Sequence, residues 1–170
     1  FLLLLPLELI WEQLLLFLDL RRAVAARGAA PDPAVEIWGA GDYQRALEYS
    51  SSKNRLAAVS SLAAFALVLV LVLTGWLGSL EALISAVPGG PILRGILYVY
   101  LVGLIFAAVS LPAAVYGQFV IEERFGFNRM TWRLFVVDTL KGLGVSLLLM
   151  TPLLAGLFLL IRSTPLWGLW

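Results

Sequence analysis

Long apolar stretches that contain no charge are the feature that most restricts the fold of this chain. Residues 56–80, 95–121 and 142–161 contain no Asp, Glu, Lys or Arg. A helix over residues 56–80 is about 37 Å long, whereas the hydrocarbon core of a bilayer is about 30 Å thick. Because lipid offers no hydrogen-bonding partners to an open backbone, these stretches predict helices that span a membrane.

The composition agrees with a membrane protein and excludes several classes of function. Of the 170 residues, 61% are hydrophobic and 14% are charged, against about 45–50% and about 25% in soluble domains. The net charge of +1 gives no basic surface for nucleic acid. The chain has no His and no Cys. We therefore expect no disulfide, no zinc site built from His or Cys and no His general base within these residues.

Two further segments complete the predicted bundle. Residues 1–20 are mostly apolar and carry three acidic residues. We interpret them as a span rather than a signal peptide, because the basic start and the cleavage site of a signal peptide are missing. The aromatic-rich end, residues 167–170, is interpreted as the start of a further helix. The predicted fold is an all-α, multi-pass transmembrane helical bundle with four spans (the fourth near 134–161) and the start of a fifth. The chain begins with Phe1 inside an apolar run, and we expect it to be a segment of a longer protein.

The distribution of Lys and Arg predicts an orientation. Residues 21–55 contain six basic residues and residues 122–133 contain three, while the intervening connection, residues 79–94, contains one. The positive-inside rule therefore places residues 21–55 and 122–133 in the cytoplasm and the amino terminus outside. The Ala-, Leu- and Arg-rich composition suggests a bacterial inner membrane.

Prolines interrupt the third and fourth spans. Pro152 leaves the carbonyl of Leu148 without its helical partner, and Pro112 has the same effect in the third span. The hydroxyl of Thr151 is close enough in sequence to help satisfy such a carbonyl. Two interpretations stay open, a kink that serves packing and a bend around a polar cavity.

The connection over residues 121–131 carries the most informative motif, Ile-Glu-Glu-Arg-Phe-Gly-Phe-Asn-Arg-Met-Thr. Gly126 and Asn128 tolerate positive φ, so a compact turn is predicted. Thr131 is placed to cap the next helix. The alternative is a solvated loop without a special role.

Asp138 and Lys141 lie three residues apart and therefore on one face of the following helix. Ionisable groups at membrane depth tend to pair and to face the bundle interior or water. The alternative is that the Lys141 side chain extends to the membrane interface.

The motif and the residues that follow it strongly resemble the membrane-embedded zinc metalloproteases called CAAX prenyl protease 1. That family has an E-x-x-F-G-F-N-x-x-T run before a helix with an Asp and a Lys at this spacing. The matching residues here are Glu122, Phe125, Gly126, Phe127, Asn128, Thr131, Asp138 and Lys141.

The resemblance implies a multi-pass helical protein that encloses a water-filled chamber. It also implies a cytoplasmic zinc protease domain that cleaves near the carboxyl terminus of prenylated or other membrane-associated proteins. The family's zinc ligands come from a His-Glu-x-x-His helix and a later Glu, beyond a five-helix amino-terminal region. Residues 1–170 would be that region, truncated before the zinc domain. We expect this segment to provide chamber and anchor, with the lipid bilayer, the zinc domain and the protein substrate as partners.

No catalytic residue and no metal ligand is expected within the segment, and zinc is expected only in the full-length protein. The eight matching residues are assigned a structural role at the cytoplasmic mouth, where they brace the protease domain or the substrate entrance. A membrane scaffold without catalysis is the main alternative. A small transporter is less favoured, because no inverted repeat is visible.

Overall fold

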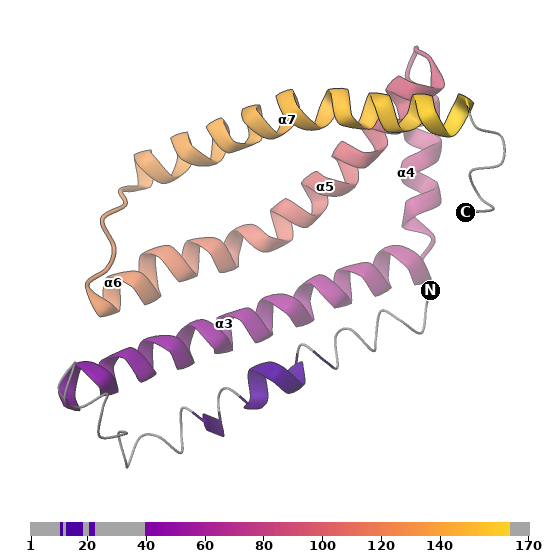
Figure 1. Cartoon of the computed structure of the whole chain (residues 1–170). Helices are drawn as coiled ribbons and strands as arrows, with labels where there is room; N and C mark the ends of the chain where they lie inside the picture. The colour runs from indigo at the N-terminus through magenta and orange to yellow at the C-terminus, as the bar shows by residue number, and fades with distance from the viewer. Residues whose placement is uncertain (1–10, 12, 19–20, 23–39, 164–170) are drawn as a thin grey trace. The chain divides into compact units, whose positions relative to one another are not determined.

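The computed structural model describes residues 11, 13–18, 21–22 and 40–163, and it contains helices and no strand within them (Figure 1). Residues 13–18 are helical. The helices that follow are α3 (Ala40–Leu73), α4 (Trp76–Ser85), α5 (Pro91–Tyr116), the π-helix η1 (Gly117–Ile121), α6 (Glu122–Phe125) and α7 (Trp132–Ser163). The all-α prediction is confirmed.

Three segments of the described chain are long and apolar enough to cross a membrane. They are Gly41–Leu73, Pro91–Phe125 and Trp132–Ser163. These match the second, third and fourth predicted spans. The first predicted span falls mostly outside the described residues, and the start of a fifth helix, residues 167–170, falls wholly outside them.

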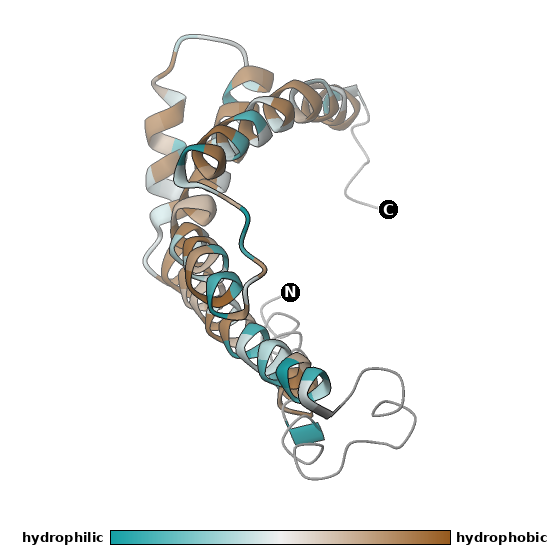
Figure 2. Ribbon diagram, turned by 90° about the vertical axis from the view of Figure 1, so that its left-hand side faces the viewer, coloured by the Kyte–Doolittle hydropathy of each residue, from teal (hydrophilic) through white to brown (hydrophobic). Residues whose placement is uncertain are grey.

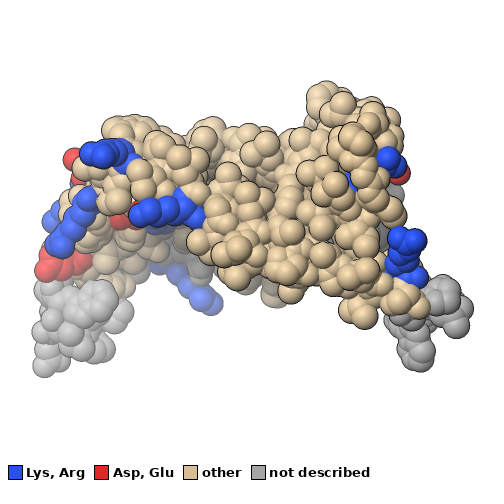
Figure 3. Space-filling view, turned by 90° about the horizontal axis from the view of Figure 1, so that it is seen from above, with Lys and Arg blue, Asp and Glu red and all other residues tan. Residues whose placement is uncertain are grey.

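The surface of these helices suits a lipid environment. Large apolar side chains are exposed along them, for example Leu148 at 74% and Leu160 at 66%. Figure 2 shows the apolar colouring along most of each long helix. In the face drawn in Figure 3, Lys, Arg, Asp and Glu side chains gather toward helix ends and the surface over the apolar helix middles is uncharged. Such continuous apolar surface is rare on soluble monomers and is what lipid solvates.

The apolar stretch 56–80 is not one helix, which differs from the single span predicted there. Helix α3 ends at Leu73, and Gly75 adopts the left-handed conformation with φ 72° before α4 begins at Trp76. Only glycine enters this region without strain from a Cβ atom. The break therefore arises at Gly75, whose backbone conformation cannot be predicted from hydropathy. At its other end α3 begins at Ala40, so the apolar part is preceded by charged turns.

The chain divides into two compact units, and each is described by itself. The first comprises Phe1–Leu69 and Ala108–Arg129, and the second comprises Val70–Ala107 and Met130–Trp170. In the first unit, Gly117 permits close approach to α3, since a Cβ on Gly117 would lie 3.1 Å from Leu56 Cδ2. This approach brings η1 and α6 against the polar part of α3.

In the second unit, helices α5 and α7 share a polar contact next to Pro152. The Thr151 hydroxyl donates to the carbonyl of Leu147 at 2.6 Å, and the Tyr100 hydroxyl lies 2.7 Å from the Thr151 Oγ1. Tyr100 also donates to the Leu147 carbonyl at 3.3 Å. Thr151 thus bonds to the carbonyl before the one that Pro152 frees, so its predicted help to Leu148 is not seen.

Candidate functional site

The Phe-Gly-Phe-Asn turn is formed by the carboxyl end of helix α6. Gly126 adopts φ 76°, its N–H donates to the carbonyl of Glu123 at 3.0 Å, and the Phe127 N–H donates to the carbonyl of Glu122 at 2.8 Å. These two bonds make a Schellman motif, in which a left-handed glycine satisfies the last carbonyls of a helix. The compact turn predicted from Gly126 is confirmed, and it holds the residues that follow in a fixed direction.

The Glu122 carboxylate is bound by two side chains of α3. The Tyr49 hydroxyl and the Lys53 Nζ each donate to Glu122 Oε1 at 2.7 Å. The Lys53 ammonium also lies 5.6 Å from the centre of the Tyr49 ring. Because the Glu122 side chain is only 16% exposed, its negative charge depends on these two donors.

Aromatic packing joins the same two elements. The Tyr49 ring meets Phe125 and Phe127 edge-on, at centroid distances of 5.3 and 5.2 Å. Phe125 is buried, whereas Phe127 is 57% exposed. The Arg45 Nη2 donates to the carbonyl of Phe125 at 2.7 Å, at the end of α6. The turn is therefore packed and hydrogen-bonded to α3, which excludes the alternative of a loop surrounded only by solvent.

Asn128 ties the turn to the helix before it. Its Nδ2 donates to Glu123 Oε2 at 2.8 Å, and its Oδ1 accepts from Gln118 Nε2 at 2.9 Å. The Asn128 N–H also donates to the carbonyl of Glu122 at 3.1 Å. With this residue, five of the predicted site residues (Glu122, Phe125, Gly126, Phe127 and Asn128) come together in one place.

The remaining predicted residues lie in the second unit. Thr131 Oγ1 accepts from the N–H of Leu134 at 3.3 Å, which confirms it as a cap of α7. Asp138 and Lys141 are both exposed on α7. The described part of the chain shows no ion pair between them.

Comparison with known proteins decides the family. The model of the family described as "CAAX prenyl protease N-terminal, five membrane helices" matches residues 20–170. The chain belongs to this family. It is thus a multi-pass integral membrane protein.

Individual relatives agree with this membrane domain. The CAAX prenyl protease 1 homolog of Taenia solium is 40% identical over 75 residues, which is 44% of this chain and 16% of the relative. The probable CAAX prenyl protease 1 of Schizosaccharomyces pombe is 29% identical over 134 residues, covering 71% of this chain and 28% of the relative. The chain thus spans less than a third of either relative.

A solved structure shows the same fold. The crystal structure of S. mikatae Ste24p superposes with a TM-score of 0.80 over 95% of this chain and 38% of that one, at 21% identity. At this identity the likeness concerns the arrangement of helices alone.

The α3 residues of the CAAX protease membrane domain were not among the predicted site residues. Arg45, Tyr49 and Lys53 recur at intervals of four, which places them on one face of a helix. The sequence signal that could have identified them is this stripe of polar and aromatic residues on a helix that continues into an apolar span. Nothing in the sequence indicates that Glu122 is its partner.

Acidic side chains are not gathered into a metal-binding group in the described part of the chain. No group of three or more His, Cys, Asp and Glu side chains that could hold one occurs within them, and the whole sequence has neither His nor Cys. Glu122 is also occupied by Tyr49 and Lys53. The Glu122 cluster (Arg45, Tyr49, Lys53, Glu122, Phe125, Phe127) therefore joins α3 to α6 as a clamp between helices.

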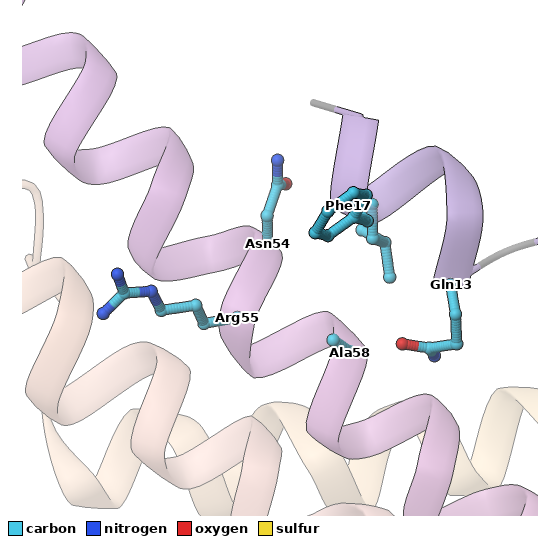
Figure 4. A pocket seen from close by; sticks show the side chains of 6 residues that line it. Gln13, Phe17, Asn54, Arg55 and Ala58 are labelled. Atoms are coloured by element: carbon cyan, nitrogen blue, oxygen red, sulfur yellow. The ribbon is translucent and has the colours of Figure 1, made fainter. Parts of the chain in front are cut away.

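A small hollow lies between residues 13–18 and α3 (Figure 4). Its volume is about 170 Å³. The Gln13 Nε2 at its wall is buried and has no hydrogen-bonding partner among the residues that the structure describes. Figure 4 shows Arg55 extending away from Gln13 and Phe17.

Proposed function

We propose that this chain is the membrane portion of a zinc metalloendopeptidase that processes prenylated CAAX-box proteins or other membrane-associated proteins. The match of the family model over residues 20–170 is the observation that carries the proposal. The names of the relatives support the substrate class, since they are CAAX prenyl proteases.

Catalysis is assigned to chain outside these residues. The relatives are much longer than the matched region, at 16% and 28% coverage of their lengths. The residues present do not fit a zinc site, because the side chains that bind zinc most tightly are missing from the sequence and the described carboxylates are not clustered. Zinc would therefore be held by a further domain, which is also a partner of this one. The present chain would contribute the anchor and the wall of a chamber.

The clamp suggests how the chain would support that domain. Glu122 and Phe125 fix the end of α6 to α3, and the Schellman motif at Gly126 fixes the direction of Phe127 and Asn128. A rigid turn with one exposed aromatic side chain is suited to bracing a neighbouring domain or the entrance for substrate. The same supporting role is proposed for Thr131, Asp138 and Lys141.

The proposed orientation puts this turn on the cytoplasmic side. The basic residues of 21–55 and 122–133 support it through the positive-inside rule, with the amino terminus outside. The bacterial inner membrane is the proposed location, and the composition is its only support.

The proposal is tested by comparing the complete protein encoded with this chain against residues 1–170 alone. Both are purified in the same detergent, zinc content is measured by mass spectrometry, and cleavage is followed with a farnesylated CAAX peptide and its non-prenylated counterpart. We expect about one zinc per complete protein, cleavage that depends on the farnesyl group and that a chelator abolishes, and neither property in residues 1–170. A complete protein without zinc and without cleavage would instead support a scaffold, and cleavage by residues 1–170 would refute the division of roles.

A further inference from the structure

A second pocket lies in the first unit, between α3 and the segment α5–η1–α6. Its volume is about 390 Å³. The apolar wall includes Leu56 and Val59 of α3 and Val120 of η1, and two arginines, Arg55 and Arg124, line the same pocket. An apolar wall with a few convergent charged groups is the usual form of a ligand site.

The pocket lies where both of its walls change from charged to apolar sequence. Arg55 is the last charged residue of α3, and residues 56–73 that follow it are uncharged. On the other wall, residues 95–121 are uncharged and end just before α6, which carries Arg124. In a membrane such a boundary coincides with the layer of lipid headgroups. The Arg side of the pocket thus belongs to the headgroups and the apolar side to the acyl chains.

The two arginines are available to a ligand. Both are exposed, and within the described part of the chain neither forms an ion pair, in contrast to Lys53 with Glu122. The Arg124 guanidinium lies over the ring of Phe125 at 5.7 Å, which orients its plane without neutralising its charge. A planar guanidinium matches the oxygens of a phosphate through paired hydrogen bonds.

We propose that this pocket binds an anionic phospholipid, with Arg55 and Arg124 on the headgroup phosphate and an acyl chain along Leu56, Val59 and Val120. Basic pockets between membrane helices bind such headgroups through charge at the interface. A lipid seated here bridges α3 and α6 beside the Glu122 clamp. The inference depends on the pocket and its charges and not on the proteolytic function.

The test uses the complete protein in nanodiscs that contain equal amounts of phosphatidylglycerol and phosphatidylcholine. Lipids that remain bound after mild extraction are counted by native mass spectrometry. We expect phosphatidylglycerol to be retained in preference to phosphatidylcholine. Either Arg55→Gln or Arg124→Gln should weaken retention about fivefold and the double variant about twenty-five-fold, from roughly 1 kcal/mol per cation. Arg129→Gln is the matched control, since Arg129 is exposed, lies in the same unit and does not line the pocket.

Three results would overturn the proposal. They are equal retention of the two lipids, equal loss in the Arg129→Gln control, and unchanged retention in the double variant. In a further experiment, inorganic phosphate is added at millimolar concentration as a competitor. We expect it not to displace the lipid, because the acyl chain adds apolar contact that free phosphate lacks; displacement would show a simple anion site instead. Unfolding temperatures of all variants are measured alongside, and they should be equal, since both arginines are exposed.

Discussion

The Nζ of Lys53 lies 2.7 Å from the Oε1 of Glu122, which is 69 residues later in the chain. The Tyr49 hydroxyl reaches the same oxygen at 2.7 Å. One carboxylate thus fixes the start of α6 to two successive turns of α3. Substitutions of these residues can therefore measure how much the contacts with α3 stabilise the Phe-Gly-Phe-Asn turn.

A double-mutant cycle on Lys53→Met and Glu122→Gln should show coupling. We expect an interaction energy of about 1 kcal/mol, because the pair is partly exposed, with side-chain exposures of 42% and 16%. Unfolding of the purified protein in detergent, followed by Trp fluorescence, measures it. Glu48→Gln is the control, since this exposed carboxylate on α3 is in no described ion pair. Additive single effects would mean that the ion pair contributes nothing.

Substitutions of Tyr49 should separate its hydroxyl from its ring. Tyr49→Phe loses only the hydrogen bond to Glu122 and should cost about 1 kcal/mol of unfolding free energy. Tyr49→Ala also loses the edge-on contacts with Phe125 and Phe127 and should cost about 3 kcal/mol. Chemical denaturation provides both values. Equal losses in the two variants would show that the ring contacts have no energetic weight.

Gly126→Ala should destabilise the turn by about 1–2 kcal/mol through backbone strain. The strain arises because Gly126 has φ 76°, a conformation that residues with a Cβ rarely adopt. It does not arise from a steric clash, because a Cβ on Gly126 would lie 3.6 Å from Arg45 Nη2, an ordinary contact distance. Gly41→Ala is the matched control, since Gly41 is in the first turn of α3 and a Cβ there meets nothing within 4 Å. Thermal unfolding should rank Gly126→Ala lowest and Gly41→Ala equal to or above the parent. The reverse order would contradict the left-handed turn.

Gly95 in α5 should tolerate no larger side chain while Phe158 is present. A Cβ on Gly95 would lie 2.9 Å from the Phe158 ring, so Gly95→Val should cost about 1–3 kcal/mol by overpacking. Phe158→Leu should recover part of that loss in the double variant. Proteolytic resistance of the protein in lipid is a suitable measurement. No recovery in the double variant would mean that these two residues do not limit each other.

Single cysteines should report the proposed orientation, because the 170 residues contain no native Cys. Ser50→Cys tests the connection assigned to the cytoplasm, and Gly90→Cys tests the turn between α4 and α5, assigned to the outside. Both positions are exposed, whereas the neighbouring Ser51 is buried and would label poorly. An impermeant maleimide should label Gly90→Cys in intact cells and Ser50→Cys only after lysis. The opposite pattern would invert the topology.

Local patterns carried much of the prediction. Continuous apolar residues predicted helices that span a membrane, and Thr131 was placed as a cap with its partner three residues away. Gly126 was expected in a turn for the same local reason. The break at Gly75 was missed, because hydropathy treats a glycine inside an apolar run as any other residue. Thr151 was expected to serve the carbonyl freed by Pro152, but it bonds to Leu147 because its hydroxyl reaches the preceding turn more directly.

By itself the sequence determined the class of fold and the identity of the motif, and its lack of His and Cys excluded zinc sites built from those residues. All three follow from residues close together in the chain or from simple composition. The tertiary structure alone decided that Glu122 pairs with Tyr49 and Lys53, and that Arg55 and Arg124 line one pocket. Such pairs depend on how two helices meet, and the close approach at Gly117 that brings them together is a property of packing rather than of any local pattern.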